Sequence, residues 1–138
     1  MNSYTYILFC LLGVVYLAST VTAATVSFNL AARGLITKEE DEDDGPDPFA
    51  KVFKNGGSAQ RSETLTDKQF PQWSYRFSFT YVPSDRLTVE LTDNDTGGDD
   101  IMGSVDVSPV DLDKDVDRDI RGHGLWAGRI RFLNVVYS

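Results

Sequence analysis

The chain has 138 residues, a formal net charge of -8 and one cysteine. A protein this acidic, without a basic stripe to displace counterions from phosphates, is not expected to bind nucleic acid. Simple electrostatic adhesion to an anionic membrane is disfavoured on the same ground, unless a bound cation reverses the charge locally. The length is sufficient for one ordinary domain with its own core.

The amino-terminal segment has the pattern of a secretory signal peptide. Residues 1–23 contain no Lys, Arg, Asp or Glu, and residues 7–17 are almost wholly apolar but too few to span a bilayer. Val21 and Ala23 are small residues at the positions that a signal peptidase reads. We therefore expect removal of residues 1–23 and one secreted domain over residues 24–138. An uncleaved membrane anchor is the alternative.

The remaining segment predicts an all-β fold. Polar and apolar residues alternate with the period of half-buried strands, and no convincing helical period is present. The expected strands are residues 25–30, 47–54, 58–65, 74–82, 86–92, 101–107 and 128–137. Two acidic segments, residues 39–44 and 93–100, are expected to be loops because like charges repel and glycines follow. Seven or eight short strands at this spacing predict a β-sandwich.

Three motifs, taken in their order along the chain, resemble motifs of the C2 domain family, whose members are calcium-dependent lipid-binding β-sandwiches. DPFAKV at residues 47–52 is similar to the start of a family strand, and PQW at residues 71–73 is similar to its Pro-x-Trp segment. LTVELTDND at residues 87–95, followed by DIMG at residues 100–103, resembles the family's acidic strand end and its Asp-x-x-Gly element. The resemblance covers nearly the whole mature chain and implies an eight-stranded antiparallel sandwich.

Within the family, the chain is most similar to the extracellular C2 domain of perforin-like proteins. The similar features are the end of the second acidic segment, residues 99–104, and the glycine-rich turn at residues 122–124 before the last strand. The chain opens directly on the strand that leads to the first acidic segment. Within the family this order implies the permuted (type II) arrangement of strands.

The second acidic segment has the spacing of a calcium site. Ca2+ takes oxygen ligands from flexible loops, and carboxylates supply most of the charge. Asp93 and Asp95 lie two residues apart at a strand end, so their side chains point to the same side. Two glycines then allow the backbone to turn and bring Asp100 back to the same ion. Asp47 starts the strand after the first acidic segment, where it can face these three residues.

The resemblance implies a set of calcium ligands. They are Asp47, Asp93, Asp95, Asp100 and, from the first acidic segment, Asp41. That segment is longer than is usual in the family, so three other acids stay open for the place of Asp41: Asp43, Asp44 and Glu39. Asp99 competes in the same way with Asp100. The two segments together with Asp47 hold eleven of the 21 acidic residues, a concentration of charge that a divalent ion would offset.

The sequence offers few residues for a zinc site or a catalytic site. His123 is the only histidine and the mature chain has no cysteine, so neither a zinc site nor a Cys-His or Ser-His-Asp catalytic set is expected. The protein is therefore not expected to be an enzyme. Asp111, Asp113 and Asp115 resemble the start of an EF-hand loop, but the glycine and the glutamate that such a loop requires are missing. We interpret this run as an exposed loop and strand edge.

The aromatic residues bear on membrane binding. Four of them are expected in the core: Phe53, Trp73, Phe77 and Phe79. In the perforin-like subtype, large aromatic residues near the tip of the second acidic loop enter the bilayer, and here Thr96 and Gly98 occupy those places. Ile36 is one apolar candidate on the first acidic loop.

These features predict a secreted, monomeric module that binds calcium and then docks on anionic phospholipid membranes. The missing aromatic residues favour an alternative, a calcium-stabilised adhesion, matrix or defence protein that binds another protein or a glycan. Asn94, Asp95 and Thr96 form a sequon for N-glycosylation inside the second acidic segment. A sugar at Asn94 is expected to sit over the ion and hinder the approach of lipid.

Overall fold

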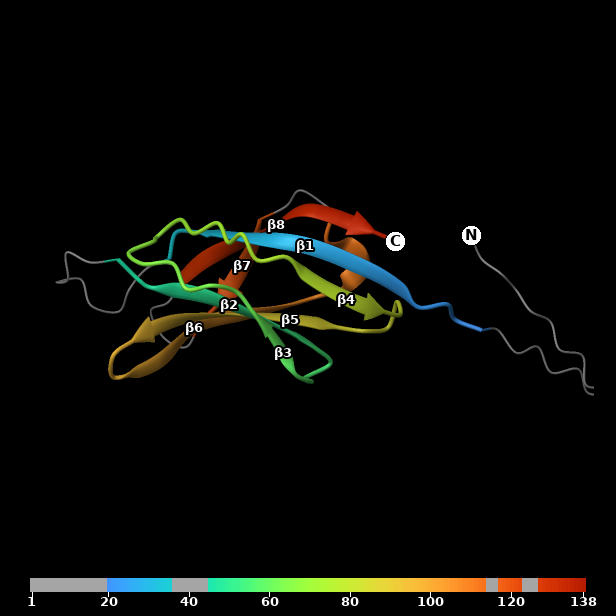
Figure 1. The fold of residues 1–138 in the computed structure, drawn as a ribbon, viewed down its shortest axis with the longest axis horizontal. Helices are drawn as coiled ribbons and strands as arrows, with labels where there is room; N and C mark the ends of the chain where they lie inside the picture. Colours follow the sequence, from blue (N-terminus) through green and yellow to red (C-terminus); the bar gives the residue numbers. More distant parts are fainter. Residues whose placement is uncertain (1–19, 36–44, 114–116, 123–126) are drawn as a thin grey trace, which may run out of the picture.

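The computed structural model describes residues 20–35, 45–113, 117–122 and 127–138, and it contains eight β-strands (Figure 1). In chain order they are β1 (Ala24–Arg33), β2 (Pro48–Lys54), β3 (Ala59–Arg61), β4 (Phe77–Tyr81), β5 (Leu87–Asp95), β6 (Gly98–Val107), β7 (Arg118–Arg121) and β8 (Ala127–Tyr137). A short 3-10 helix, Pro109–Asp111, follows β6. Over these ranges, no helix is long and apolar enough to cross a bilayer.

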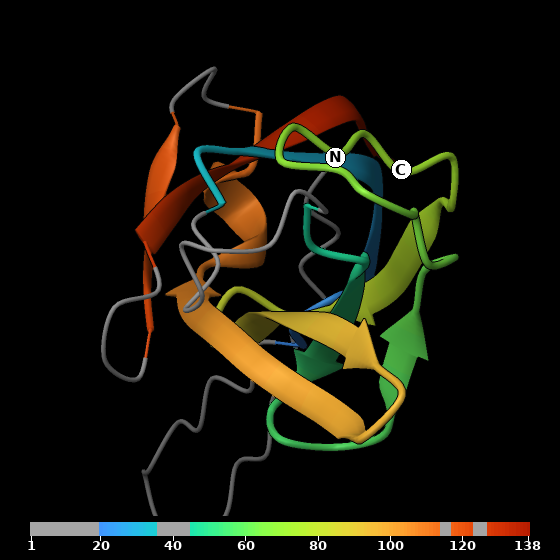
Figure 2. The same cartoon turned by 90° about the vertical axis from the view of Figure 1, so that its left-hand side faces the viewer.

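The strands form one antiparallel sheet in the order β3-β2-β5-β6-β7-β8-β1-β4, which folds over into two layers. The first four strands in this order form one layer and the last four the other (Figure 2). Among the described residues, a single pair, Ser104 with Arg121, joins β6 to β7 and so connects the layers. The expected eight-stranded antiparallel β-sandwich is therefore confirmed.

The chain enters and leaves the sandwich at the end opposite to the tip of the β5–β6 hairpin (Figure 1). Thr25, near the start of β1, donates a backbone hydrogen bond of 2.7 Å to Ser138 and accepts one of 2.9 Å from it. This pairing fixes both ends of the domain to each other. The hairpin tip consequently lies at the far end of the sandwich from Thr25 and Ser138.

The alternating pattern of the sequence places apolar side chains between the layers. Phe28 of β1 is fully buried, and its ring centroid lies 5.6 Å from that of Phe77 and 5.0 Å from that of Phe132. Aromatic pairs at such distances add about 1 kcal/mol each beyond the burial of their area. Phe28, Phe77 and Phe132 come from β1, β4 and β8, so this cluster holds one layer together from inside.

The expected core aromatics are confirmed for Trp73, Phe77 and Phe79, which are all buried. The expectation is wrong for Phe53, which is only half-buried. Val52 faces the core, and because successive side chains of a strand point to opposite faces, Phe53 points to the outer face of its layer.

One polar side chain covers an exposed sheet edge. Gln60 of β3 donates a hydrogen bond of 2.6 Å from its Nε2 to the carbonyl of Ser78 in β4, and its Oε1 accepts one of 3.1 Å from the Ser78 amide. β3 and β4 are the two edges of the sheet. The Gln60 amide thus occupies the backbone groups of β4 with which another chain would otherwise pair.

One local expectation is wrong. The segment at residues 93–100 is not a loop, because β5 and β6 continue through it and pair Asp95 with Gly98 around a two-residue turn. Cross-strand hydrogen bonding there outweighs the weak local preference of a charged sequence for a strand. β7 begins at Arg118, after the acidic run at residues 111–115, and pairs with β8.

Gly103 is required where the two layers meet. A Cβ atom at this position would lie 2.9 Å from the carbonyl oxygen of Arg121 and would also collide with the side chain of Ile120. We therefore expect Gly103→Ala to lower the free energy of unfolding by about 2 kcal/mol, because the backbone of β7 would have to move. Thermal or urea unfolding measures this change.

Gly97→Ala is the matched control, because a Cβ atom there would meet no described residue within 4 Å other than its chain neighbours. Its stability without added calcium should stay close to that of the wild type. Equal stability of the Gly103→Ala variant and the wild type would show that β7 does not approach Gly103 as the structure places it.

Candidate functional site

The tip of the β5–β6 hairpin carries three of the five predicted calcium ligands, Asp93, Asp95 and Asp100. Thr96 and Gly97 form the turn, and Gly98 follows with a φ of 133°, which few residues other than glycine adopt. The register pairs Asp93 with Asp100 and Asp95 with Gly98. Residues that lie directly opposite in an antiparallel pair share a face of the sheet.

The pleat of the hairpin sorts its polar residues onto two faces. Asp93 and Asp95 point to the same face, and the pairing of Asp93 with Asp100 places Asp100 there too. Asn94 pairs with Asp99, so these two residues lie on the opposite face. The choice between Asp99 and Asp100 therefore favours Asp100. A sugar on Asn94 would project from the other side of the hairpin.

Asp93 is the buried member of this group, with only 6% of its surface exposed. Its Oδ1 accepts a hydrogen bond of 2.7 Å from the backbone amide of Asp47. Burial raises the pKa of the Asp93 carboxyl, and the nearby charges of Asp95 and Asp47 raise it further, against the lowering effect of the amide hydrogen bonds. A bound cation would reverse this penalty.

Asp47 lies between the hairpin and the loop that connects β3 to β4. Its carbonyl accepts a hydrogen bond of 3.1 Å from the amide of Asn94, and its Oδ1 accepts one of 2.9 Å from the amide of Asp67. Asp67 has a φ of 54°, a conformation that aspartate tolerates better than most residues. Asp47 is therefore fixed by contacts to two segments that are remote in the sequence.

The same β3–β4 loop also donates hydrogen bonds to Pro46 and Pro48, the two chain neighbours of Asp47. The Pro48 carbonyl accepts hydrogen bonds from the indole Nε1 of Trp73, at 3.2 Å, and from the amide of Leu65, at 3.1 Å. The Pro46 carbonyl accepts one of 2.8 Å from the amide of Lys68. The motifs at residues 47–52 and 71–73 thus meet in space, and the buried tryptophan orients the start of β2.

The structure brings Asp47, Asp93, Asp95 and Asp100 to one end of the sandwich. Over the described ranges, however, no three carboxylate, imidazole or thiol groups are already drawn together as a metal-binding cluster. Asp41 lies outside the described residues, and so do its alternatives Asp43, Asp44 and Glu39. The assignment of all five ligands stays a prediction.

The chemistry of the donors that are described suits a hard cation. Carboxylate and backbone carbonyl oxygens are the groups that Ca2+ prefers, and its coordination tolerates irregular geometry. Asp95 and Asp100 are exposed on strand ends at the hairpin tip. Both side chains are exposed and could turn toward an ion that Asp93 would hold from the buried side.

The other sequence candidates do not add to this site. Asp111 ends the 3-10 helix after β6, at the opposite end of β6 from the hairpin tip. Asp113 is exposed in the turn that follows, whereas Asp115 and His123 lie outside the described residues. Ile36 also lies outside them. The rejection of a second calcium loop stays a prediction.

Sequence reasoning missed two residues of the β3–β4 loop that lie at the same end. Asp67 contacts Asp47 through its amide, and Phe70 is 70% exposed. Both lie in a polar, proline-bearing segment without strand periodicity. A large apolar residue in such a segment was the available signal for Phe70, whereas no local pattern indicates the contact between Asp67 and Asp47.

Known solved structures share this architecture at low identity. The structure described as BON1-C2B is 16% identical, with a TM-score of 0.66 over 84% of this chain and 92% of that chain. A C2 domain of plant extended synaptotagmin 1 is 16% identical, with a TM-score of 0.61 over 83% and 96%. A pair of C2 domains of extended synaptotagmin 2, calcium bound, gives 18% identity and a TM-score of 0.59 over 82% and 46%. These similarities show the fold.

The sequence comparison identifies the family. No curated protein sequence matches the chain significantly. The similarity to perforin-like proteins finds no support in these matches and stays an interpretation of the sequence, as does the permuted strand order. The family model of the C2 domain matches residues 26–121, which is most of the 138 residues. The chain therefore belongs to the C2 domain family.

Proposed function

We propose that this C2 domain is a secreted, monomeric module that binds calcium and then docks on anionic phospholipid membranes. It acts by binding and not by catalysis. The observation that carries the proposal is the buried carboxylate of Asp93. Burial raises the pKa of this carboxyl, and the nearby charges of Asp95 and Asp47 raise it further. A buried carboxylate that also feels the charges of two other acids destabilises the fold unless a cation is bound.

The proposed ligands act from two sides of the ion. Asp93 is fixed by the amide of Asp47 and binds from the buried side, while Asp95 and Asp100 bind from the exposed hairpin tip. Asp47 and one acid of the first acidic segment, Asp41 in our assignment, complete the set. Calcium supplies the positive charge that this end of the domain lacks.

Bound calcium explains how an acidic protein reaches an anionic membrane. With a net charge of -8, the domain is repelled by such a surface. Ions at the tip of the sandwich neutralise its carboxylates and keep open positions for lipid phosphate oxygens. The calcium-bound state of extended synaptotagmin 2, a structure of the same fold, supports this assignment.

An alternative function is suggested by the hairpin tip itself. Thr96 and Gly98 are exposed there and offer no apolar anchor, and Asn94 of the sequon is exposed beside them. A calcium-stabilised adhesion, matrix or defence protein that binds another protein or a glycan would need no such anchor. This alternative predicts stabilisation by calcium without binding to lipid.

Removal of the Asp93 charge tests the calcium site. Without calcium, the raised pKa means that the unfolding free energy of the wild type falls as the pH rises through that pKa. Asp93→Asn should therefore be more stable than the wild type in chelator at neutral pH. Calcium at about a hundredfold above its Kd should stabilise the wild type by about 3 kcal/mol and the variant far less. Thermal melting with calcium and with chelator measures both.

Thr92→Val is the matched control for that experiment. Thr92 is buried next to Asp93, and its hydroxyl has no hydrogen-bond partner among the described residues. The substitution should leave the unfolding free energy nearly unchanged and preserve the response to calcium. If the wild type melts at the same temperature in calcium and in chelator, the calcium site is refuted.

Cosedimentation with vesicles tests the membrane step. Phosphatidylcholine vesicles that contain phosphatidylserine should bind the wild type in calcium and release it in chelator. Asp95→Asn and Asp100→Asn should each weaken binding by about tenfold or more, because each removes a charged ligand. Asp106→Asn is the control, since Asp106 is an exposed acid near the end of β6 far from the hairpin tip and accepts a hydrogen bond from the Thr88 hydroxyl. Calcium-dependent stabilisation without any vesicle binding would favour the alternative function.

Secretion is tested by expression of the full chain in a eukaryotic host. We expect protein in the medium whose first residue is Ala24, which is also the first residue of β1. Retention of the full chain in the membrane fraction would support the uncleaved anchor instead.

A further inference from the structure

A hollow of about 570 Å³ lies on the layer opposite to the acidic hairpin, at the same end of the sandwich. Arg33 of β1 and Arg129 of β8 line it, and Phe70 of the β3–β4 loop forms an aromatic wall. Gly34 and Gly128 keep the backbone open to the hollow, and most of its lining surface is apolar. Asp119 and Ile120 of β7 complete the lining. The hollow therefore combines two positive charges, one negative charge, an exposed ring and a mostly apolar floor.

The two arginines are direct neighbours in the sheet. The register of β1 and β8 pairs Arg33 with Arg129. Like charges that lie directly opposite in a sheet are destabilising, so this pairing costs stability in a protein that is otherwise acidic. Proteins commonly retain such destabilising pairs of charges at binding sites.

The aspartates nearby offset this charge only in part. Asp117 is largely buried and divides its oxygens between Arg33 and Arg131, which lies 2.8 Å from it. Asp119 pairs with Arg129 at 3.2 Å, but its side chain is 81% exposed, so the pair is weak and screened by salt. Counted over the described residues, these three arginines and two aspartates leave one net positive charge, on a protein whose net charge is -8.

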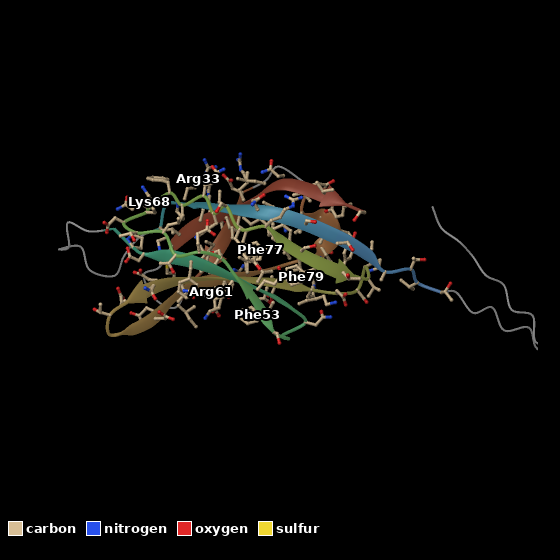
Figure 3. All side chains as sticks on the ribbon, in the orientation of Figure 1. Arg33, Phe53, Arg61, Lys68, Phe77 and Phe79 are labelled. Carbon is tan, nitrogen blue, oxygen red and sulfur yellow. The ribbon has the colours of Figure 1, made fainter. Side chains whose placement is uncertain are left out.

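Phe70 is exposed but firmly placed. The amide of Ala32 donates a hydrogen bond of 2.9 Å to the carbonyl of Pro71, and the amide of Leu35 donates one of 3.5 Å to that of Gln69. These bonds fix both neighbours of Phe70 along β1. Lys68 is exposed two residues earlier, and Figure 3 shows it at the same end of the sandwich as Arg33. The ring thus shares the hollow with Arg33 and Arg129, and Lys68 lies two residues away along the loop.

We propose that this surface, formed by Arg33, Lys68, Phe70 and Arg129, is a second membrane contact that binds the phosphate group of an anionic phospholipid. Guanidinium groups bind phosphate through paired hydrogen bonds, and an aromatic ring between cations suits the boundary between headgroups and acyl chains. The inference rests on the proposed function and extends it. It also supplies the apolar anchor that Thr96 and Gly98 do not provide.

The position of this surface fits one orientation on the membrane. The acidic hairpin lies in the layer of β5 and β6, and Arg33 and Arg129 lie in the layer of β1 and β8, at the same end. A membrane that meets this end can contact the calcium ions on one layer and the arginines on the other. The two contacts together fix the orientation of the domain on the membrane, whereas either contact alone would allow the domain to tilt.

The test compares single substitutions in binding to phosphatidylcholine vesicles that contain phosphatidylserine, at saturating calcium. Arg129→Gln should weaken binding about fivefold, the factor expected for one positive charge close to an anionic leaflet. Phe70→Ala should weaken it about tenfold through the loss of buried aromatic surface. Arg129 is chosen over Arg33 because its partner Asp119 is exposed and tolerates the loss.

Matched controls lie at the other end of the sandwich. Arg86→Gln makes the same change of net charge in an exposed loop residue, and Val110→Ala shortens an apolar side chain that is 42% exposed. Both should bind vesicles with wild-type affinity. All four variants should keep the calcium-dependent rise in melting temperature, which shows that fold and calcium site are intact.

The outcomes separate this inference from the proposed function. If Arg129→Gln binds like Arg86→Gln and Phe70→Ala like Val110→Ala, the second contact is overturned while calcium-dependent docking stands. If the wild type does not bind vesicles at saturating calcium, both are overturned. Self-association of the wild type that Phe70→Ala abolishes, seen by sedimentation, would assign the surface to a second copy of the chain instead.

Discussion

The hydrogen bond of 2.7 Å from the Asp47 amide to the buried carboxylate of Asp93 is the interaction on which this end of the domain depends. It joins the start of β2 to the end of β5 and places a charge where water has little access. A second hydrogen bond, from the Asp67 amide to the Asp47 carboxylate, holds Asp47 against the β3–β4 loop. The geometry that would hold a cation is thus part of the fold itself.

The family motifs have physical reasons in this structure. Trp73 donates to the Pro48 carbonyl and so orients the strand that carries Asp47. Gly103 allows β7 to approach β6, which is where the two layers connect among the described residues. Each motif positions the acidic hairpin or the strands that support it. The remaining strands of the sandwich hold these elements in place, and the chain enters and leaves at the opposite end.

The fold was largely predictable from the sequence, since alternation in β1, β4 and β5 gives their buried faces directly. The extension of β5 and β6 through residues 93–100 was not, because acidic residues and glycines disfavour strands locally and cross-strand pairing outweighs them. For the site, pleating indicated that Asp93 and Asp95 share a face. The contact of Asp67 with Asp47 and the surface around Phe70 depend on how a loop without periodicity packs, which no local pattern records.

Calcium titration followed by calorimetry, on residues 24–138 and on their Asp93→Asn variant, tests the central claim most directly. The account predicts binding by the wild type that grows weaker as the pH falls into the range where Asp93 is protonated, since its pKa is raised. It also predicts that Asp93→Asn binds far more weakly. Binding of equal strength by both proteins, or none by the wild type at millimolar calcium, would contradict it.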